Sequence, residues 1–315
     1  MAIRVAATMR IADHITAGIR NTPELARAVN ADVDALDRVL RHLVKVGVLD
    51  RNDSGEYTLT AEGEALRDDH PARLRGMLDI ENAIGRADLS FVRLLHSART
   101  GEPGFPLQFG RSFWEDLSAD PARSASFDAQ MASDVAADAP AIVAAYDWAS
   151  LGHVVDVGGG NGALLIAMLS AHPSLRGTVF DLPDTAERAR GALSAAGLAD
   201  RGDVVAGSFF DPVLAGAGGY LLSAILHDWD DESARAILRR CAEAAGAEAP
   251  IFVVEKIGAD GKALRTGMDL RMLVYFGGRE RGVEELTTLG VSAGLRVAAV
   301  HPAGELALVE MRARR

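Results

Sequence analysis

Cysteine and positive charge are both scarce in this sequence. Cys241 is the single cysteine among 315 residues, which excludes an internal disulfide and a cysteine metal cluster. We expect it to be a small, buried apolar residue. Lys and Arg number 33 against 44 Asp and Glu, giving a net charge of -11. This balance argues against nucleic acid or an anionic membrane as a partner, because both attract basic surfaces.

Long apolar runs and aromatic residues are also lacking. No segment approaches the roughly 20 apolar residues of a membrane-crossing helix. The first residues lack the apolar stretch of a signal peptide, so we expect a cytoplasmic protein. The aromatic share is 5%, but the apolar share of 49% is ordinary for a globular protein. The length suits two domains.

Residues 1–99 predict a small, mostly helical domain. Apolar residues recur at helical spacing from Ile3 through Ile11 to Ile15, which predicts one continuous helix. Thr22 before Pro23 is typical of a helix cap followed by proline at the first helical position. A second apolar stripe runs over residues 33–46 and is stopped by Gly47.

A hairpin follows these helices. Residues 48–50 and 57–59 flank a turn-rich segment, which is a hairpin signal. Helices and a hairpin in this order predict a winged helix, a fold often used on DNA. On the helix predicted over residues 33–46, the acids Asp34 and Asp37 balance the positive charge of the bases. A scaffold or dimerisation role is therefore favoured over DNA binding.

Residues 100–315 predict a second domain of the α/β class. After helical connections and a long helix over 122–148, short apolar runs alternate with helical patterns, which indicates a parallel sheet covered by helices. The expected helices are 162–171, 184–196, 230–245 and 266–275. The expected strands are 153–157, 177–180, 203–206, 220–225, 251–254, 295–300 and 306–311. Only five residues separate the last two strands, so they should be antiparallel.

A glycine loop follows the first strand of this domain. Asp156 ends the strand, and residues 158–162 read Gly-Gly-Gly-Asn-Gly before a helix. Glycines let the backbone approach a ligand at the carboxyl ends of the strands, beside a helix N-terminus. Asp181, which ends the next strand, could hold ribose hydroxyls of NAD or of S-adenosylmethionine. Asp156 favours the latter, because a carboxylate suits a methionine ammonium and repels a pyrophosphate.

His227 follows the strand predicted over 220–225, at the same edge of the sheet. With an ordinary pKa near 6.5, it could accept a proton at neutral pH. The acids 230–232 are expected to cap and begin the following helix. No other histidine has zinc-ligand spacing with a third ligand, so no metal is predicted.

These motifs, in this order, resemble the small-molecule O-methyltransferases of the caffeic acid methyltransferase type, and most of all the actinobacterial anthracycline and polyketide methyltransferases. The matching segments are Val154–Gly162, Phe180–Pro183, Gly207–Phe210, His227–Glu232, Val253–Glu255 and Gly277–Arg281. The N-terminal region is similar to the dimerisation domain of that family. The resemblance implies a Rossmann-like methyltransferase sheet with an antiparallel last strand and a winged-helix dimerisation domain.

The resemblance also implies site residues. His227 matches the catalytic base, and Glu255 and Glu280 match the acids beside it, although Glu255 could instead pair with Lys256 or Arg271. The positions that match the S-adenosylmethionine site are Asp156, Gly158, Gly160, Asp181, Leu182, Ser208, Phe209 and Ser223. Ser208 departs from the family, in which many members have an acid there.

The acceptor site is the least defined. Phe127 and Met131 match substrate-wall positions, but their helical spacing fits ordinary packing equally well. Asp228 and Tyr275 are further pocket candidates. The implied reaction is transfer of the methyl of S-adenosylmethionine to a hydroxyl of an aromatic natural product, within a homodimer. Alternatives are an S-adenosylmethionine-binding decarboxylase or hydroxylase, a winged-helix regulator that senses a small molecule, and an NAD oxidoreductase.

Overall fold

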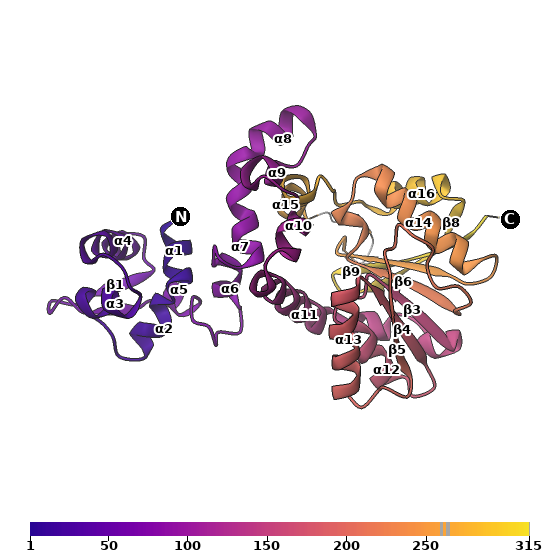
Figure 1. Cartoon of the computed structure of the whole chain (residues 1–315), viewed down its shortest axis with the longest axis horizontal. Helices are drawn as coiled ribbons and strands as arrows, with labels where there is room; N and C mark the ends of the chain where they lie inside the picture. The colour runs from indigo at the N-terminus through magenta and orange to yellow at the C-terminus, as the bar shows by residue number, and fades with distance from the viewer. Residues whose placement is uncertain (259–260, 263–264, 315) are drawn as a thin grey trace. The chain divides into compact units, whose positions relative to one another are not determined.

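The computed structural model describes residues 1–258, 261–262 and 265–314 (Figure 1). It divides the chain into two units that do not follow chain order. The first unit comprises Met1–Val92 and Phe105–Gln130, and the second comprises Arg93–Gly104 and the chain from Met131 onward. Dimerisation by residues 1–99 and catalysis by 100–315 stay predictions. None of the described helices is long and apolar enough to cross a membrane.

The first unit begins with helices packed around a small core. Its elements up to the hairpin are α1 (Ala2–Thr8), α2 (Ile11–Thr16), α3 (Thr22–Ala28), α4 (Val33–Lys45), β1 (Leu49–Arg51) and β2 (Tyr57–Leu59). The predicted hairpin is confirmed, because β1 and β2 pair antiparallel. Leu25, Leu40, Leu43 and Tyr57 are fully buried in the core. The winged-helix assignment of this arrangement stays a prediction.

Two expectations for these helices were wrong. The first apolar stripe forms two helices, because Arg10 adopts a left-handed φ of 53° between α1 and α2. The cap of α3 is Asn21, whose side chain accepts a hydrogen bond from the Glu24 amide, and Thr22 already lies inside the helix. On α4, Arg38 and Arg41 form ion pairs with acids one turn earlier on the same helix.

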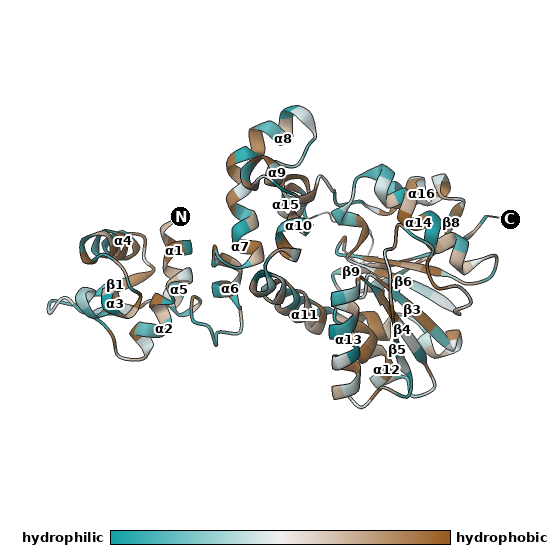
Figure 2. Cartoon of the chain, in the orientation of Figure 1, coloured by the Kyte–Doolittle hydropathy of each residue, from teal (hydrophilic) through white to brown (hydrophobic). Residues whose placement is uncertain are grey.

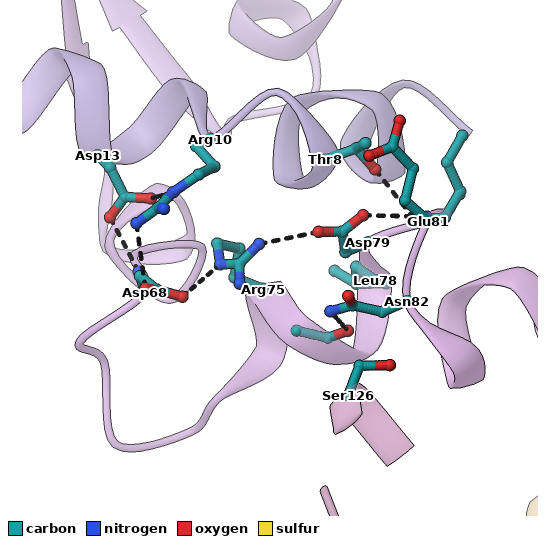
Figure 3. Close-up of polar contacts among 12 residues, drawn as sticks. Thr8, Arg10, Asp13, Asp68, Arg75, Leu78, Asp79, Glu81, Asn82 and Ser126 are labelled. Atoms are coloured by element: carbon teal, nitrogen blue, oxygen red, sulfur yellow. Dashed lines mark hydrogen bonds and ion pairs between the residues drawn. The ribbon is translucent and has the colours of Figure 1, made fainter. Parts of the chain in front are cut away.

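A chain of charged residues joins α2 to the segment after the hairpin (Figure 3). Arg10 and Arg75 both bind the Asp68 carboxylate, at 3.1 and 2.6 Å, and Arg75 also binds Asp79 at 3.0 Å. Asp13 accepts a hydrogen bond from the Asp68 amide. The later elements of this unit are α5 (Ala61–Glu64), α6 (Leu74–Leu78), α7 (Ala83–Asp88), η1 (Leu89–Arg93), α9 (Gly104–Phe109), α10 (Phe113–Ser118) and the first part of α11 (Pro121–Ala144).

The second unit is built on a mixed seven-stranded sheet in the order β5-β4-β3-β6-β7-β9-β8. The strands are β3 (His153–Val157), β4 (Arg176–Asp181), β5 (Gly202–Ala206), β6 (Gly219–Ser223), β7 (Ile251–Glu255), β8 (Leu295–Ala303) and β9 (Leu306–Ala313). The first five are parallel, and β9 is antiparallel to both neighbours, as predicted. Figure 2 shows apolar residues along the strands and many hydrophilic ones on the covering helices.

Some helices of the second unit precede the first strand of the sheet, and the others lie between its strands in the chain. They are α8 (Leu94–Thr100), the end of α11, η2 (Trp148–Leu151), α12 (Ala163–Ala171), α13 (Pro183–Ala195), η3 (Leu226–Asp228), α14 (Asp231–Ala245), α15 (Thr266–Phe276) and α16 (Val283–Ser292). The sequence pattern missed α16, and the helix predicted to reach Trp148 ends at Ala144. Cys241 is buried in α14, as predicted.

Candidate active site

The glycine loop connects β3 to α12 and has backbone angles that favour glycine. Gly158, Gly160 and Gly162 all have positive φ, of 72°, 60° and 81°. A Cβ added to Gly158 would lie 2.6 Å from the Ile225 side chain, whereas one on Gly160 would meet nothing within 4 Å. Glycine is thus required at Gly158 by both backbone and space. The open side at Gly160 leaves the backbone accessible to a ligand.

Asp156 lies at the end of β3, beneath this loop. Its side chain is buried, and its Oδ2 atom has no hydrogen-bond partner among the residues that the structure describes. A Cβ on Gly159 would lie 2.7 Å from that oxygen, so the loop closes over the carboxylate only because residue 159 is glycine. Burial, with a smaller contribution from Asp181, raises the pKa of Asp156 to about 7. A buried carboxylate with an unpartnered oxygen is a natural receptor for a cationic ligand group.

Asp181 ends β4 and faces the same loop. Its Oδ2 accepts a hydrogen bond from the Gly160 amide at 2.8 Å, and its Oδ1 accepts one from the Leu182 amide at 2.7 Å. These bonds fix the carboxylate beside the glycines, where its remaining lone pairs can receive hydroxyl groups. The Leu182 side chain is 55% exposed at the start of α13.

The next two strands bring further predicted residues to this edge. The Ser208 hydroxyl, just after β5, accepts a hydrogen bond from the Phe210 amide at 3.2 Å. Phe209 lies close to Gly158 and makes an edge contact with Trp229, with ring centroids 5.8 Å apart. Ser223 is the last residue of β6. The carboxyl ends of parallel strands meet at one edge of a sheet, so these residues lie around the same loop.

His227 sits in the short helix η3 after β6 and faces three carboxylates. Its Nδ1 atom lies 3.2 Å from Glu280 Oε1 and 3.3 Å from Glu255 Oε2, and its Nε2 atom lies 3.5 Å from Asp228 Oδ1. The side chains of Glu255 and Glu280 are almost wholly buried, whereas that of His227 is 19% exposed. Nδ1 is hydrogen-bonded to Glu280 and faces Glu255, whereas Nε2 makes the longer contact with Asp228 and is the nitrogen we assign to the chemistry.

The acids reverse the ordinary effect of burial on the histidine. Burial opposes the imidazolium form, but Glu255, Asp228 and Glu280 outweigh it and raise the pKa of His227 to about 10. Burial also raises the pKa of Glu255 to about 7 and that of Asp228 to about 6. The expectation of an ordinary pKa near 6.5 for His227 was therefore wrong. The cluster stabilises a proton on the ring.

A residue with a left-handed backbone angle separates β6 from the turn that carries His227. Ala224 has a left-handed φ of 54°, and its amide donates to the Val254 carbonyl at 2.9 Å. The strand predicted to reach Ile225 therefore ends at Ser223, because this angle breaks the pleat. The Ala224 side chain is exposed, so it gains no packing in return for the strain.

We expect glycine at position 224 to stabilise the protein. Glycine adopts positive φ without strain, and no buried contact is lost, so Ala224→Gly should raise the free energy of unfolding by about 0.5–1 kcal/mol. Urea unfolding followed by fluorescence measures this. The matched control is Ala195→Gly at an exposed position of α13, which should lower the value by a similar amount. Equal losses in both variants would show that Ala224 is not strained.

The predicted acceptor residues fall in different surroundings. In the first unit, Phe127 of α11 makes edge contacts with Phe113 and Trp114, at 5.6 and 5.9 Å between centroids. Met131 is half-buried further along α11, and Tyr275 is buried in α15, in edge contact with Phe276. Phe127 is half-buried, and its ring contacts are with other aromatic residues of the same unit. Substrate contact by these three residues stays a prediction, whereas Asp228 lies directly beside the His227 ring.

One of the two alternative partners considered for Glu255 is engaged elsewhere, while pairing with Arg271 stays untested. Lys256 forms an ion pair of 2.7 Å with Asp138 of α11, whereas Glu255 faces His227. Sequence reasoning gave no role to Arg281, although it lies in a matched segment. Arg281 is 3% exposed and binds the backbone on both sides of His227. The available signal in the sequence was an arginine directly after Glu280 in a segment of glycines and charged residues.

Comparison with known families agrees with this geometry. The profile of the O-methyltransferase domain family matches residues 91–296, and the profile of the O-methyltransferase dimerisation domain matches residues 1–68. The chain belongs to the O-methyltransferase family. It is an S-adenosylmethionine-dependent methyltransferase, which confirms the predicted enzyme class, cofactor and fold. The buried, unpartnered Asp156 and the glycine cradle fit that cationic cofactor.

Individual relatives of the methyltransferase come from antibiotic pathways. It is 57% identical to 2,7-dihydroxy-5-methyl-1-naphthoate 7-O-methyltransferase of Streptomyces carzinostaticus, over 99% of this chain and 94% of the relative. It is 44% identical to aclacinomycin 10-hydroxylase RdmB of Streptomyces purpurascens, over 98% and 84%. The crystal structure of the neocarzinostatin enzyme NcsB1 with S-adenosylmethionine and 2-hydroxy-5-methyl naphthoic acid matches with a TM-score of 0.96 at 57% identity, covering 100% of this chain and 95% of that one.

Proposed function

We propose that this methyltransferase methylates a phenolic hydroxyl of a naphthoate-like aromatic acid, with His227 as the general base. The observation that carries the proposal is the fixed orientation of the ring. Glu280 holds Nδ1 by a hydrogen bond of 3.2 Å and Glu255 faces the same atom at 3.3 Å, so Nε2, at 3.5 Å from Asp228, is the nitrogen that would take the hydroxyl proton of the acceptor. The naphthoate methyltransferase that shares 57% of its residues supports the acceptor class.

The same edge of the sheet would hold the cofactor. The carboxylate of Asp156 would receive the methionine ammonium, and Asp181 would receive the ribose hydroxyls. The glycines at 158 and 160 would allow close backbone approach, while Leu182, Ser208, Phe209 and Ser223 would surround the remainder. When bound, S-adenosylmethionine supplies an electrophilic methyl group on a positively charged sulfur.

The raised pKa of His227 makes it a strong base. A phenol has a pKa of about 10, and the pKa of His227 is also about 10. A proton can therefore move from the acceptor hydroxyl to Nε2 at little cost in free energy. Glu255 and Glu280 then face the imidazolium and stabilise it, as a carboxylate does beside a catalytic histidine in hydrolases.

This matching predicts a rate that increases with pH well into the alkaline range. Methyl transfer requires that either the His227 imidazolium or the acceptor phenol has lost its proton. Both groups have a pKa of about 10, so this deprotonated form is a minor one at neutral pH. We therefore expect kcat/KM to increase about tenfold per pH unit between roughly pH 7 and 9. Initial rates with a simple naphthol, in buffers of constant ionic strength, test this. A plateau that begins near pH 7 would contradict the raised pKa.

We further propose that the enzyme acts as a homodimer through its first unit. The match of residues 1–68 to the dimerisation domain supports this. Met1, Ile3, Val33 and Val46 expose apolar side chains there, whereas Ile11 and Ile15 are buried in the unit's own core. Sedimentation equilibrium would give the mass of two chains, and a single-chain mass at micromolar concentration would refute the dimer.

A second candidate reaction is hydroxylation. The 44% identity to aclacinomycin 10-hydroxylase favours it, because the alignment with that relative covers 98% of this chain. The two reactions differ in product mass. Incubation under air, with a thiol reductant, methyl-labelled S-adenosylmethionine and a panel of hydroxylated naphthoic acids, should give a labelled product that is heavier by one CH2 unit. An unlabelled product that has gained an oxygen atom would select the hydroxylase instead.

A further inference from the structure

The segment Gly277–Gly282, between α15 and α16, packs against the backbone of the His227 turn. The Arg279 amide donates a hydrogen bond to the His227 carbonyl at 2.9 Å. A Cβ added to Gly278 would lie 2.2 Å from that same carbonyl oxygen. The approach is therefore closer than any side chain at position 278 would allow. This segment also carries Glu280, which holds the histidine ring.

Arg281 makes the strongest link between this segment and the turn. Its Nη1 donates to the Leu226 carbonyl and its Nη2 to the Trp229 carbonyl, both at 2.7 Å. Nε and Nη2 both bind Asp231 Oδ1, at 2.9 and 2.8 Å. The guanidinium is therefore hydrogen-bonded to the backbone one residue before and two residues after His227. It also binds the first residue of the helix that follows.

The burial of this side chain shows that the contact is not an ordinary surface ion pair. The Arg281 side chain is 2% exposed, whereas that of Arg279, two residues earlier, is 50% exposed, pairs with Glu285 at 2.9 Å and makes a longer contact of 3.7 Å with Asp231. A guanidinium is planar and presents its donors in a fixed fork, so two carbonyls bound to it have a defined separation. Loss of the fork would leave those carbonyls without their strongest donor in a largely dry environment.

We propose that Arg281 is a positioning residue that fixes His227 relative to Glu280. Glu280 precedes Arg281 in the chain, so the same short segment holds the ring through the acid and the ring's backbone through the guanidinium. The distance of 3.2 Å between His227 Nδ1 and Glu280 Oε1 then depends on this fork. The inference rests on the proposed role of His227 as the base.

The charges around His227 give this role an electrostatic consequence. The groups that face the ring are Asp228 from its own turn, Glu255 from β7 and Glu280 from the segment after α15. The positive charge of Arg281 favours the ionised form of Glu255 and so opposes the effect of burial on its pKa. Without Arg281, the acids would be less well placed and less ionised, and the pKa of His227 would fall.

The test compares Arg281→Met and Arg281→Lys with Arg279→Met in the full-length enzyme. We expect Arg281→Met to lower kcat on the order of 10²-fold, as small misplacements of catalytic groups do. Its affinity for S-adenosylhomocysteine should stay within about threefold of wild type, and Arg279→Met should keep both values within about threefold. Arg281→Lys retains the charge but lacks the fork, so kcat should still be reduced at least about tenfold.

The pH profile separates positioning from a merely structural role. In Arg281→Met, the increase of kcat/KM with pH should level off at lower pH than in wild type. Rates are divided by the number of sites that bind S-adenosylhomocysteine, so a partly unfolded preparation does not imitate the effect. If Arg281→Met follows the wild-type profile, scaled only by its folded fraction, the proposal is overturned. Full activity of Arg281→Lys would overturn it as well.

A His227→Asn variant in the same assays separates this inference from the proposed function. If His227→Asn is inactive and Arg281→Met is fully active, the base assignment stands and the positioning role fails. If His227→Asn is fully active, the base assignment itself fails.

Discussion

Replacing His227 by asparagine should lower kcat by roughly 10²–10⁴-fold, the usual contribution of a general base. The asparagine amide can still donate to Glu280 in place of Nδ1. At the position of Nε2, however, no nitrogen remains to take the hydroxyl proton of the substrate. Cofactor affinity should change little, because His227 is assigned to the acceptor side of the site. Single-turnover transfer from labelled S-adenosylmethionine measures the rate, and calorimetry with S-adenosylhomocysteine measures binding.

The controls for His227→Asn address the three acids around it. The variant lacks the positive imidazolium of His227, so Glu255 or Asp228 should take up a proton more readily. Burial already raises the pKa values of both acids. Thermal unfolding of the variant at pH 6 and pH 8 reports whether this disturbs the fold. A folded variant that binds the cofactor and transfers methyl groups at the wild-type rate would exclude His227 as the base.

Replacing Asp156 by asparagine should weaken binding of S-adenosylmethionine on the order of 10²-fold at pH 8. Loss of one partner of a buried charge pair costs about 2–5 kcal/mol, which corresponds to a factor of this size or more. In the wild type the pKa of Asp156 is about 7. Only the ionised form attracts an ammonium group, so affinity should fall about tenfold per unit as pH drops below about 7.

The pH dependence is the sharper half of this prediction. Asp156→Asn cannot titrate, so its affinity should stay nearly constant between pH 5.5 and 8 (an interval that spans the raised pKa of about 7). The matched control is Asp203→Asn, which removes an exposed carboxylate near the opposite end of β5. Isothermal calorimetry at several pH values gives both series. A wild-type affinity that does not decrease at acid pH would show that Asp156 does not receive the ammonium.

The sheet and its active edge could be predicted because their signals are local. Five short apolar runs separated by helical patterns indicate parallel strands, and the short link before Leu306 indicates the antiparallel finish. Parallel strands present their carboxyl ends at one edge, so the sequence alone places Asp156, Asp181 and His227 together. The structure adds the distances and the unpartnered Oδ2 of Asp156.

The errors occurred where one backbone angle or a weak pattern decides the outcome. The apolar spacing continues through Arg10, but its left-handed angle breaks the helix there. The strand before His227 is cut short at Ala224 for the same reason. Helix α16 contains Thr287, Thr288 and Gly290, which have modest helix propensity, so its apolar positions Leu286 and Leu289 gave little signal.

The electrostatics of the site could not be predicted from sequence. The acids that face His227 come from β7 and from the segment after α15, and their combined effect depends on distances of about 3 Å. Burial of Arg281 depends on Gly278, which allows the two backbones to meet. Neither the distances between His227 and its acids nor the burial of Arg281 gives a periodic pattern in the sequence.

The most direct test of His227 as the base varies the acidity of the acceptor. Methyl transfer by wild type and by His227→Asn is measured at pH 8 for a series of naphthols whose hydroxyl pKa ranges from about 10 to well below 8. A hydroxyl that is already ionised needs no base, so the defect of the variant should shrink steadily as the pKa of the acceptor falls. A defect of constant size across the series would contradict the assignment of proton transfer to His227.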